Sequence, residues 1–253
     1  MKKNNFSSER GSGLAAFLFV LVVIGLAIGA FMMAQQFLGS ARTKGTIAQI
    51  EGYKTAVIGF KQLYNALPGD MYNVEKRVPG CKDKETGASL CEEGDGNGFI
   101  GETKGNLMEL DQTLEGFPYS ETLQFWRHLL AADMIGGFET LSEDLDIAWE
   151  RSHPLSKLGV GGYHVLFMRN VPEGYSASGH FLRLQTFVSG PPVLGEGENV
   201  ASYAEAIELE KKMDNGNLRS GNIIAVGPSC INEEEGSSLF PPKNCVLFFN
   251  LFK

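Results

Sequence analysis

A long, nearly uninterrupted apolar run dominates the first part of the chain. It extends from Leu14 to Ala34, and no charged residue occurs between Gly11 and Ala41. At about 1.5 Å per residue, a helix of this length spans roughly 30 Å, which is the thickness of the hydrocarbon core of a bilayer. We therefore predict that residues 12–40 form the transmembrane half of a helix.

A second apolar pattern follows directly. Over residues 41–67 the apolar residues recur at steps of three and four, which places them on one face of an α-helix. They are Ile47, Ile50, Tyr53, Val57, Phe60, Tyr64 and Leu67. Pro68-Gly69 ends the pattern, because proline disfavours helical geometry in the preceding residue and glycine permits a turn. The pattern predicts an amphipathic second half of the same helix.

The charges before the apolar run predict its orientation. Lys2, Lys3 and Arg10 precede it, against the single Glu9. Because basic flanks stay on the cytoplasmic side, we predict a cytoplasmic N-terminus and a head on the other side of the membrane. A cleaved signal peptide is the alternative. Its apolar region is usually about 7 to 15 residues long and ends in a small-x-small site, which this longer run lacks.

Residues 68–253 predict one globular head. Helices are expected from Glu121 to Met134 and from Ala201 to Met213, each closed by a glycine-containing turn. Segments rich in β-branched and aromatic residues predict four strands, the first two as a hairpin. These are Tyr163–Arg169, His180–Val188, Asn222–Val226 and Cys245–Phe252. The predicted fold class is α+β, with the long N-terminal helix packed on a small, mainly antiparallel sheet.

The four cysteines all follow the apolar run and form two sequence-local pairs. Their spacings match neither a zinc ribbon nor a C-x-x-C redox motif, so two disulfides in an oxidising compartment are the better interpretation. Four cysteines allow three connectivities. The one that we favour joins near neighbours, Cys81–Cys91 and Cys230–Cys245.

Charge and motifs argue against two classes of function. The formal net charge of −8 is unfavourable for binding a nucleic-acid backbone, which selects a basic face. The four histidines are scattered without an H-E-x-x-H pattern, and no G-x-S-x-G motif occurs. We therefore expect no nucleic-acid partner and no catalytic activity.

Several short motifs resemble type IV pilins and type II secretion pseudopilins. In that family a prepilin peptidase removes a short basic leader that ends in glycine. Glu9-Arg10-Gly11 looks like such an end, which makes residues 1–11 the leader and Gly11–Ser12 the processing site, with Gly13–Leu14 as the alternative. The resemblance continues through scattered segments: Ala48–Ala56, Phe60, Tyr64, Leu67–Asp70, Gly94–Gly98, Phe125–Leu129, Lys212–Gly216 and Ser220-Gly221.

Two positions differ from the usual pattern of that family. Its members begin the processed chain with a bulky apolar residue and carry glutamate four residues later. Here the processed chain would begin with Ser12 or Leu14, and Ala16 or Leu18 stands in place of the glutamate. In the family this glutamate is thought to neutralise the N-terminal amine of a neighbouring subunit, since an unpaired charge in an apolar core is costly. The tip pseudopilin also lacks this glutamate, so the resemblance implies a minor or tip subunit.

One loop has the spacing of cation ligands. Oxygen-bearing side chains occur at every second position and are followed by glycine, as in the first half of an EF-hand calcium loop. The match is incomplete, because Lys104 stands where the loop has its bidentate glutamate. The alternative is a glycine-rich acidic turn without an ion, and both interpretations stay open. The candidate Ca²⁺ ligands are Glu93, Asp95, Asn97 and Glu102.

The resemblance implies a structural function. The chain would be cut by prepilin peptidase, engage an inner-membrane assembly platform, and leave the membrane lipid to pack against other pilin or pseudopilin subunits. The expected filament-packing residues are Leu14, Phe17, Leu21, Ile24 and Ile28. The head would lie in the periplasm, or outside the cell in a filament. The alternative is a single-pass anchored binding protein or adhesin that never enters a filament.

Overall fold

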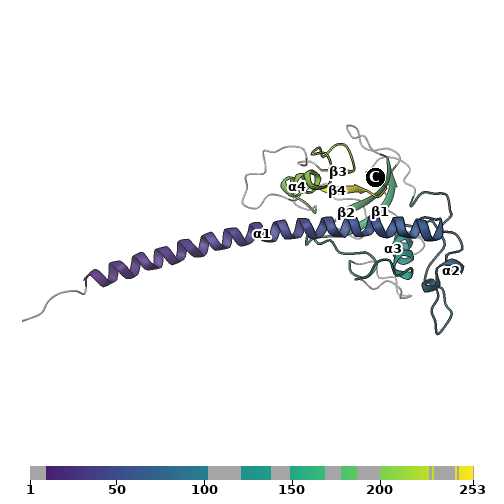
Figure 1. Ribbon diagram of the computed structural model, residues 1–253, viewed down its shortest axis with the longest axis horizontal. Coiled ribbons are helices and arrows are strands. Elements are labelled where there is room, and N and C mark those ends of the chain that lie inside the picture. The colour runs from purple at the N-terminus through teal and green to yellow at the C-terminus, as the bar shows by residue number, and fades with distance from the viewer. Residues whose placement is uncertain are drawn as a thin grey trace, which may run out of the picture. The chain divides into compact units, whose positions relative to one another are not determined.

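The computed structural model describes residues 10–101, 121–137, 149–168, 178–186, 200–227, 230, 243 and 245–252. They form an α+β structure with an N-terminal apolar helix and a small antiparallel sheet (Figure 1). The chain divides into two compact units, Met1–Arg42 and Thr43–Lys253. The sheet, the disulfides and the shorter helices all belong to the second unit.

Helix α1 extends from Arg10 to Tyr64. It ends before the predicted position, Leu67, because Asn65 adopts the left-handed conformation with a φ of 50°. The amide of Asn65 donates a hydrogen bond to the Lys61 carbonyl at 2.9 Å, which closes the last turn. Asparagine is one of the few residues besides glycine that tolerates this conformation at a helix end. A C-terminal cap therefore ends α1 before Pro68 is reached.

The second part of α1 contributes to the main apolar core of the head. Ile50, Val57 and Phe60 are fully buried, and all lie on the face that the sequence periodicity predicts. The ring of Tyr53 lies 5.1 Å from that of Trp126 and 5.5 Å from that of Tyr163. Such edge-to-face aromatic contacts add to the free energy gained by burial.

Within the described residues, four antiparallel strands form the sheet, in the order β1-β2-β4-β3. Each lies inside or within one residue of a predicted strand, and β1 and β2 form the predicted hairpin. The sequence did not predict this order, in which the last strand, β4, lies between β2 and β3. The strands are β1 (Gly162–Met168), β2 (Gly179–Gln185), β3 (Ile223–Val226) and β4 (Val246–Asn250).

Both faces of the sheet are buried. Leu182 and Leu184 of β2 belong to the main core, whereas Phe181 belongs to a second apolar cluster on the opposite face. Arg183 also faces that second side and is 5% exposed, and burial lowers its pKa to about 9. Burial on both faces explains why β3 and β4 are apolar at almost every position.

Two further helices flank the core. Helix α3 (Glu121–Ala131) ends before the predicted Met134, because Asp133 adopts a left-handed φ of 56°. Helix α4 (Tyr203–Met213) contacts β3 and begins with a capping box, in which Ser202 and Glu205 bond each other's backbone amides.

Short helical turns and disulfides connect these elements. Helix α2 (Val74–Arg77) and the 3₁₀ helix η1 (Pro79–Cys81) were not predicted, because they are too short to show a period. The structure pairs Cys81 with Cys91 and Cys230 with Cys245, as the sequence-local pairing expects. Closing loops of this size stabilises a fold by about 3 kcal/mol in the chain-entropy model.

Candidate functional site

The first unit offers an exposed apolar surface. Over Ala15–Met33 the mean hydropathy is 2.8 and none of the described side chains is buried. By length and composition this part of α1 can cross a membrane. Soluble proteins rarely expose a continuous apolar patch of this extent, which makes the segment a candidate surface for lipid or for partner proteins.

The sequence-predicted packing residues lie on this surface. Phe17, Leu21, Ile24 and Ile28 are between 48% and 61% exposed, and the side chain of Leu14 lies outside the described part. The candidate processing residues, Gly11 to Leu14, belong to the helical beginning of α1. This helical conformation is the same at both sites and does not distinguish the two processing alternatives.

In the second unit, three distant segments bring carboxylates together. Asp70 follows the turn after α1, Asp95 lies in the glycine-rich loop, and Glu121 is the first residue of α3. One oxygen from each lies within 4.8 Å of the others. We call Asp70, Asp95 and Glu121 the acidic cluster.

The glycine-rich loop wraps around Asp70 and fixes its position. The amide of Gly96 donates to the Asp70 main-chain carbonyl at 2.9 Å, and the amide of Gly98 donates to Asp70 Oδ2 at 3.0 Å. At Gly94 a Cβ atom would lie 2.4 Å from the Asp70 backbone, so only glycine permits this approach. Asp70 is 5% exposed as a result.

Glu121 connects the same loop to the start of α3. Its two carboxylate oxygens accept hydrogen bonds from the amides of Asp95 at 3.1 Å and Gly101 at 3.0 Å. Asp95 in turn accepts from the amide of Asn97 at 2.9 Å. These bonds hold the carboxylates in place and leave Asp70 Oδ1 as a buried oxygen without a hydrogen-bond partner among the described residues.

The carboxylates disfavour one another's ionised forms. Burial raises the pKa of Asp70, the hydrogen bond from Gly98 lowers it, and the nearby Asp95 raises it again. Burial likewise raises the pKa of Glu121, and the charges of Asp95 and Asp70 add to this effect. Like charges at short range in a partly buried site favour a proton or a cation that neutralises them.

A buried histidine is hydrogen-bonded to both of the segments that carry Asp70 and Asp95. His128 of α3 is fully buried; its Nδ1 accepts from the Gly69 amide at 2.9 Å, and its Nε2 lies 2.9 Å from the Glu92 carbonyl. Because Nδ1 accepts, Nε2 carries the proton and donates it to Glu92, which defines a neutral imidazole. Burial lowers the pKa of His128 to about 4. Gly69 has a φ of 87°, and a Cβ there would lie 2.3 Å from the Glu121 carbonyl.

The acidic cluster differs from the ligand set expected from the sequence. Asp95 is common to both, but Glu93 is exposed and does not belong to the cluster. The Asn97 side-chain oxygen accepts from the Phe99 amide at 2.7 Å, and its nitrogen donates to Asp95 at 2.7 Å. Glu102 lies outside the described residues. Sequence reasoning missed Asp70 and Glu121, although Pro-Gly-Asp turns and acidic helix starts were both visible.

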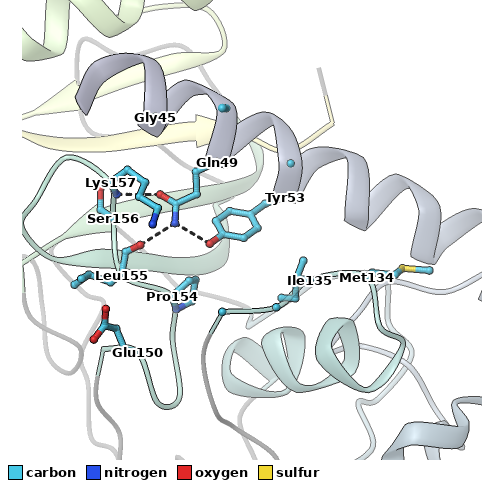
Figure 2. Close-up of a pocket in the computed structure, with 14 residues that line it drawn as sticks. Gly45, Gln49, Tyr53, Met134, Ile135, Glu150, Pro154, Leu155, Ser156 and Lys157 are labelled. Atoms are coloured by element: carbon cyan, nitrogen blue, oxygen red, sulfur yellow. Dashed lines mark hydrogen bonds between the residues drawn. The ribbon is translucent and has the colours of Figure 1, made fainter. Parts of the chain in front are cut away.

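A groove of about 580 Å³ lies elsewhere in the head, along α1. Figure 2 shows that Gln49 bridges its two sides. The amide nitrogen of Gln49 donates to the Leu155 carbonyl at 2.7 Å and to the Tyr53 hydroxyl at 3.0 Å, and its oxygen accepts from the Lys157 amide at 3.0 Å. These bonds fasten α1 to the loop before β1, which indicates a structural role for Gln49.

Comparisons of the chain with protein-family models, with curated proteins and with solved structures found no match.

Proposed function

We propose that this protein is a minor pilin or pseudopilin subunit that assembles through its apolar N-terminal helix into a filament of the type IV pilus or type II secretion kind. The observation that carries the proposal is the exposed, charge-free segment Ala15–Met33, which continues in the same helix into a one-sided, buried half. A helix that is apolar all round needs surroundings that the chain itself does not supply.

In this proposal α1 acts as a stalk that is packed on the head sheet. The close approach of Tyr53 to Tyr163 of β1 supports that packing. The apolar half stays in the inner membrane until the assembly platform brings it beside other subunits, whose helices offer equally apolar surroundings. The transfer is then nearly neutral in hydrophobic free energy, so that side-chain packing and small residues determine which partner is accepted.

The disulfides support a head on the periplasmic side. Cys81–Cys91 and Cys230–Cys245 persist in an oxidising compartment, which agrees with the orientation that the basic residues before the helix predict. A small head fixed by two such bonds suits an extracytoplasmic or extracellular position.

The experiment that tests this function maps the N-terminus of the membrane-extracted protein by mass spectrometry. In cells with active prepilin peptidase we expect the chain to begin at Ser12 or Leu14, and in cells without it at Met1. Gly11→Glu and Gly13→Glu variants identify the processing site, because only one of them should block cleavage.

Two outcomes would contradict the proposal. A Met1 terminus in both strains would favour the anchored binding protein or adhesin. A terminus beyond Ala34 in a released, soluble protein would establish a cleaved signal peptide instead.

A further inference from the structure

We propose that Arg183 binds a small monocarboxylate on the second face of the sheet, the face that carries Phe181 and Phe248. This inference goes beyond the filament function and does not depend on it. It involves no residue of the acidic cluster.

The strand register places Arg183 beside an apolar cluster. Arg183 lies on β2, an interior strand of the sheet, directly opposite His164 of β1 and Phe248 of β4. Side chains that are directly opposite in antiparallel strands share one face of the sheet. Phe248 and Phe181, which is two residues before Arg183, belong to the second apolar cluster and are almost fully buried. A charged group is thus surrounded mainly by side chains that exclude water.

The guanidinium group of Arg183 carries donors that no described residue uses. The residue is 5% exposed, and its Nε and Nη1 atoms are buried without a hydrogen-bond partner among the described residues. Burial lowers the pKa of Arg183 to about 9, so the group still carries its positive charge at neutral pH. A buried charge with unused donors is costly, and an anion that accepts hydrogen bonds from it reduces that cost.

The described residues of this face contain no negative group that could balance the charge. Side chains alternate between the two faces of a strand, so the polar neighbours of Arg183 on its own face follow from the register. They are His164, Gln185 and Asn250, and none of them is acidic. In the proposal the balancing charge comes from a bound ligand.

The guanidinium group favours a carboxylate among the common anions. Its planar, fork-like set of N–H donors matches the two oxygens of a carboxylate, which accept two parallel hydrogen bonds. A single negative charge balances the single positive charge of Arg183, whereas a phosphate monoester carries about 1.5 to 2 charges near neutral pH.

The aromatic neighbours favour a ligand with an apolar part. Ligand sites are usually lined by apolar side chains, with a few polar groups that fix the orientation of the ligand. Phe181 and Phe248 supply the apolar lining beside Arg183, which supplies the polar contact. A short-chain monocarboxylate, with acetate as the simplest probe, combines both properties.

The test compares the melting temperature of full-length, detergent-solubilised protein in sodium acetate and in sodium chloride at equal ionic strength. We expect acetate to raise the melting temperature on the order of 5 °C at about 100 times its dissociation constant. The response should saturate, as expected for one site in each chain. Chloride, which lacks the paired oxygens, should give no such response.

Three variants assign the response to Arg183. Arg183→Lys keeps a positive charge without the planar fork and should weaken acetate binding at least tenfold, measured as a shift in the midpoint of the response. Arg183→Met should abolish the response, and it also reports any general effect of acetate on a folded protein. Arg219→Met removes an exposed arginine of the head and should respond like the natural chain.

The proposal is overturned by equal melting curves of the natural chain in acetate and in chloride. It is also overturned by an acetate response that persists in Arg183→Met or that disappears in Arg219→Met. If Arg183→Met does not fold, the comparison of acetate with chloride and the midpoint of Arg183→Lys decide the question.

Discussion

The two halves of α1 share one backbone conformation but differ in what surrounds their side chains. Between Ala15 and Met33 the described side chains are all exposed, although nearly all are apolar. Between Ile50 and Phe60 one face is fully buried in the head, and the opposite face is polar or exposed. The same kind of residue, such as isoleucine, is thus exposed at position 24 and buried at position 50.

This difference shows that the spacing of apolar residues, more than their number, determines where a helix finds its partners. One stripe of apolar residues can be covered by the rest of the same chain. A helix that is apolar all round is covered on every side only in lipid or among other helices. The two halves therefore depend on different environments, and changes in one half should leave the other intact.

The largest expected effect is on the buried half. Phe60→Ala should lower the free energy of unfolding of the head by about 4 kcal/mol, since truncating a fully buried phenylalanine removes apolar contacts and leaves a cavity. Urea unfolding followed by tryptophan fluorescence measures this, because Trp126 and Trp149 both belong to the head. Membrane retention should not change.

The control for this prediction is Leu63→Ala, on the exposed side of the same helix. Leu63 is 66% exposed, so the change should alter stability by less than about 0.5 kcal/mol. If Phe60→Ala and Leu63→Ala gave the same stability, the assignment of the buried face would be wrong.

The next effect is on the apolar half. Ile24→Arg should cost about 3 kcal/mol of membrane insertion, because arginine is unfavourable near the centre of a spanning helix. We expect less protein in alkali-washed membranes and an unchanged unfolding curve of the head. Ile58→Arg, at a 46% exposed position of the other half, should remain in the membrane like the natural chain. Equal retention of the two variants would contradict a membrane role for residues 15–33.

A smaller effect, that of pH on stability, distinguishes the head from the apolar half of α1. The pKa of His128 is lowered from its ordinary 6.5 to about 4, so the unfolded chain binds a proton more readily than the folded one. This histidine therefore contributes its full stability above pH 6.5, and the contribution is lost as the pH falls toward 4. The loss is about 2 kcal/mol at pH 5, at 1.36 kcal/mol for each unit below 6.5.

The measurement compares urea unfolding of the natural chain and of His128→Gln between pH 7 and pH 4. His180 and His153 also have pKa values lowered by burial, to about 4 and about 3, so they act in the same range in both proteins. The difference between the two proteins isolates His128. Parallel pH profiles would contradict a neutral, buried His128. Membrane retention should not vary with pH, because no ionisable side chain occurs between Gly11 and Ala41.

Features that are encoded within a few neighbouring residues were predictable from the sequence. The two patterns of α1, the β1–β2 hairpin and the disulfide pairs all depend on short separations along the chain. The end of α1 was placed too late because the proline at position 68 was the more obvious signal. The left-handed conformation of Asn65 depends on its local surroundings, which spacing alone does not reveal.

Long-range features were not predictable in the same way. Nothing in a strand's own residues states that β4 lies between β2 and β3, since strand order is a property of the whole chain. The acidic cluster was missed for the same reason: Asp95 and Glu121 lie 26 residues apart, and Asp70 comes from a third segment. A template for one continuous loop includes Asp95 but not Asp70 or Glu121, which the fold places beside it.

Gly69 and Gly94 have a consequence for how this protein tolerates change. Neither offers a side chain to a ligand, yet each leaves room for backbone to approach backbone, one at Glu121 and the other at Asp70. In a saturation mutagenesis screen, even alanine at either position should score as poorly as loss of a carboxylate. These two glycines would thus be among the positions of the head that tolerate substitution least. They carry no functional group, but they set the distances between the carboxylates around them.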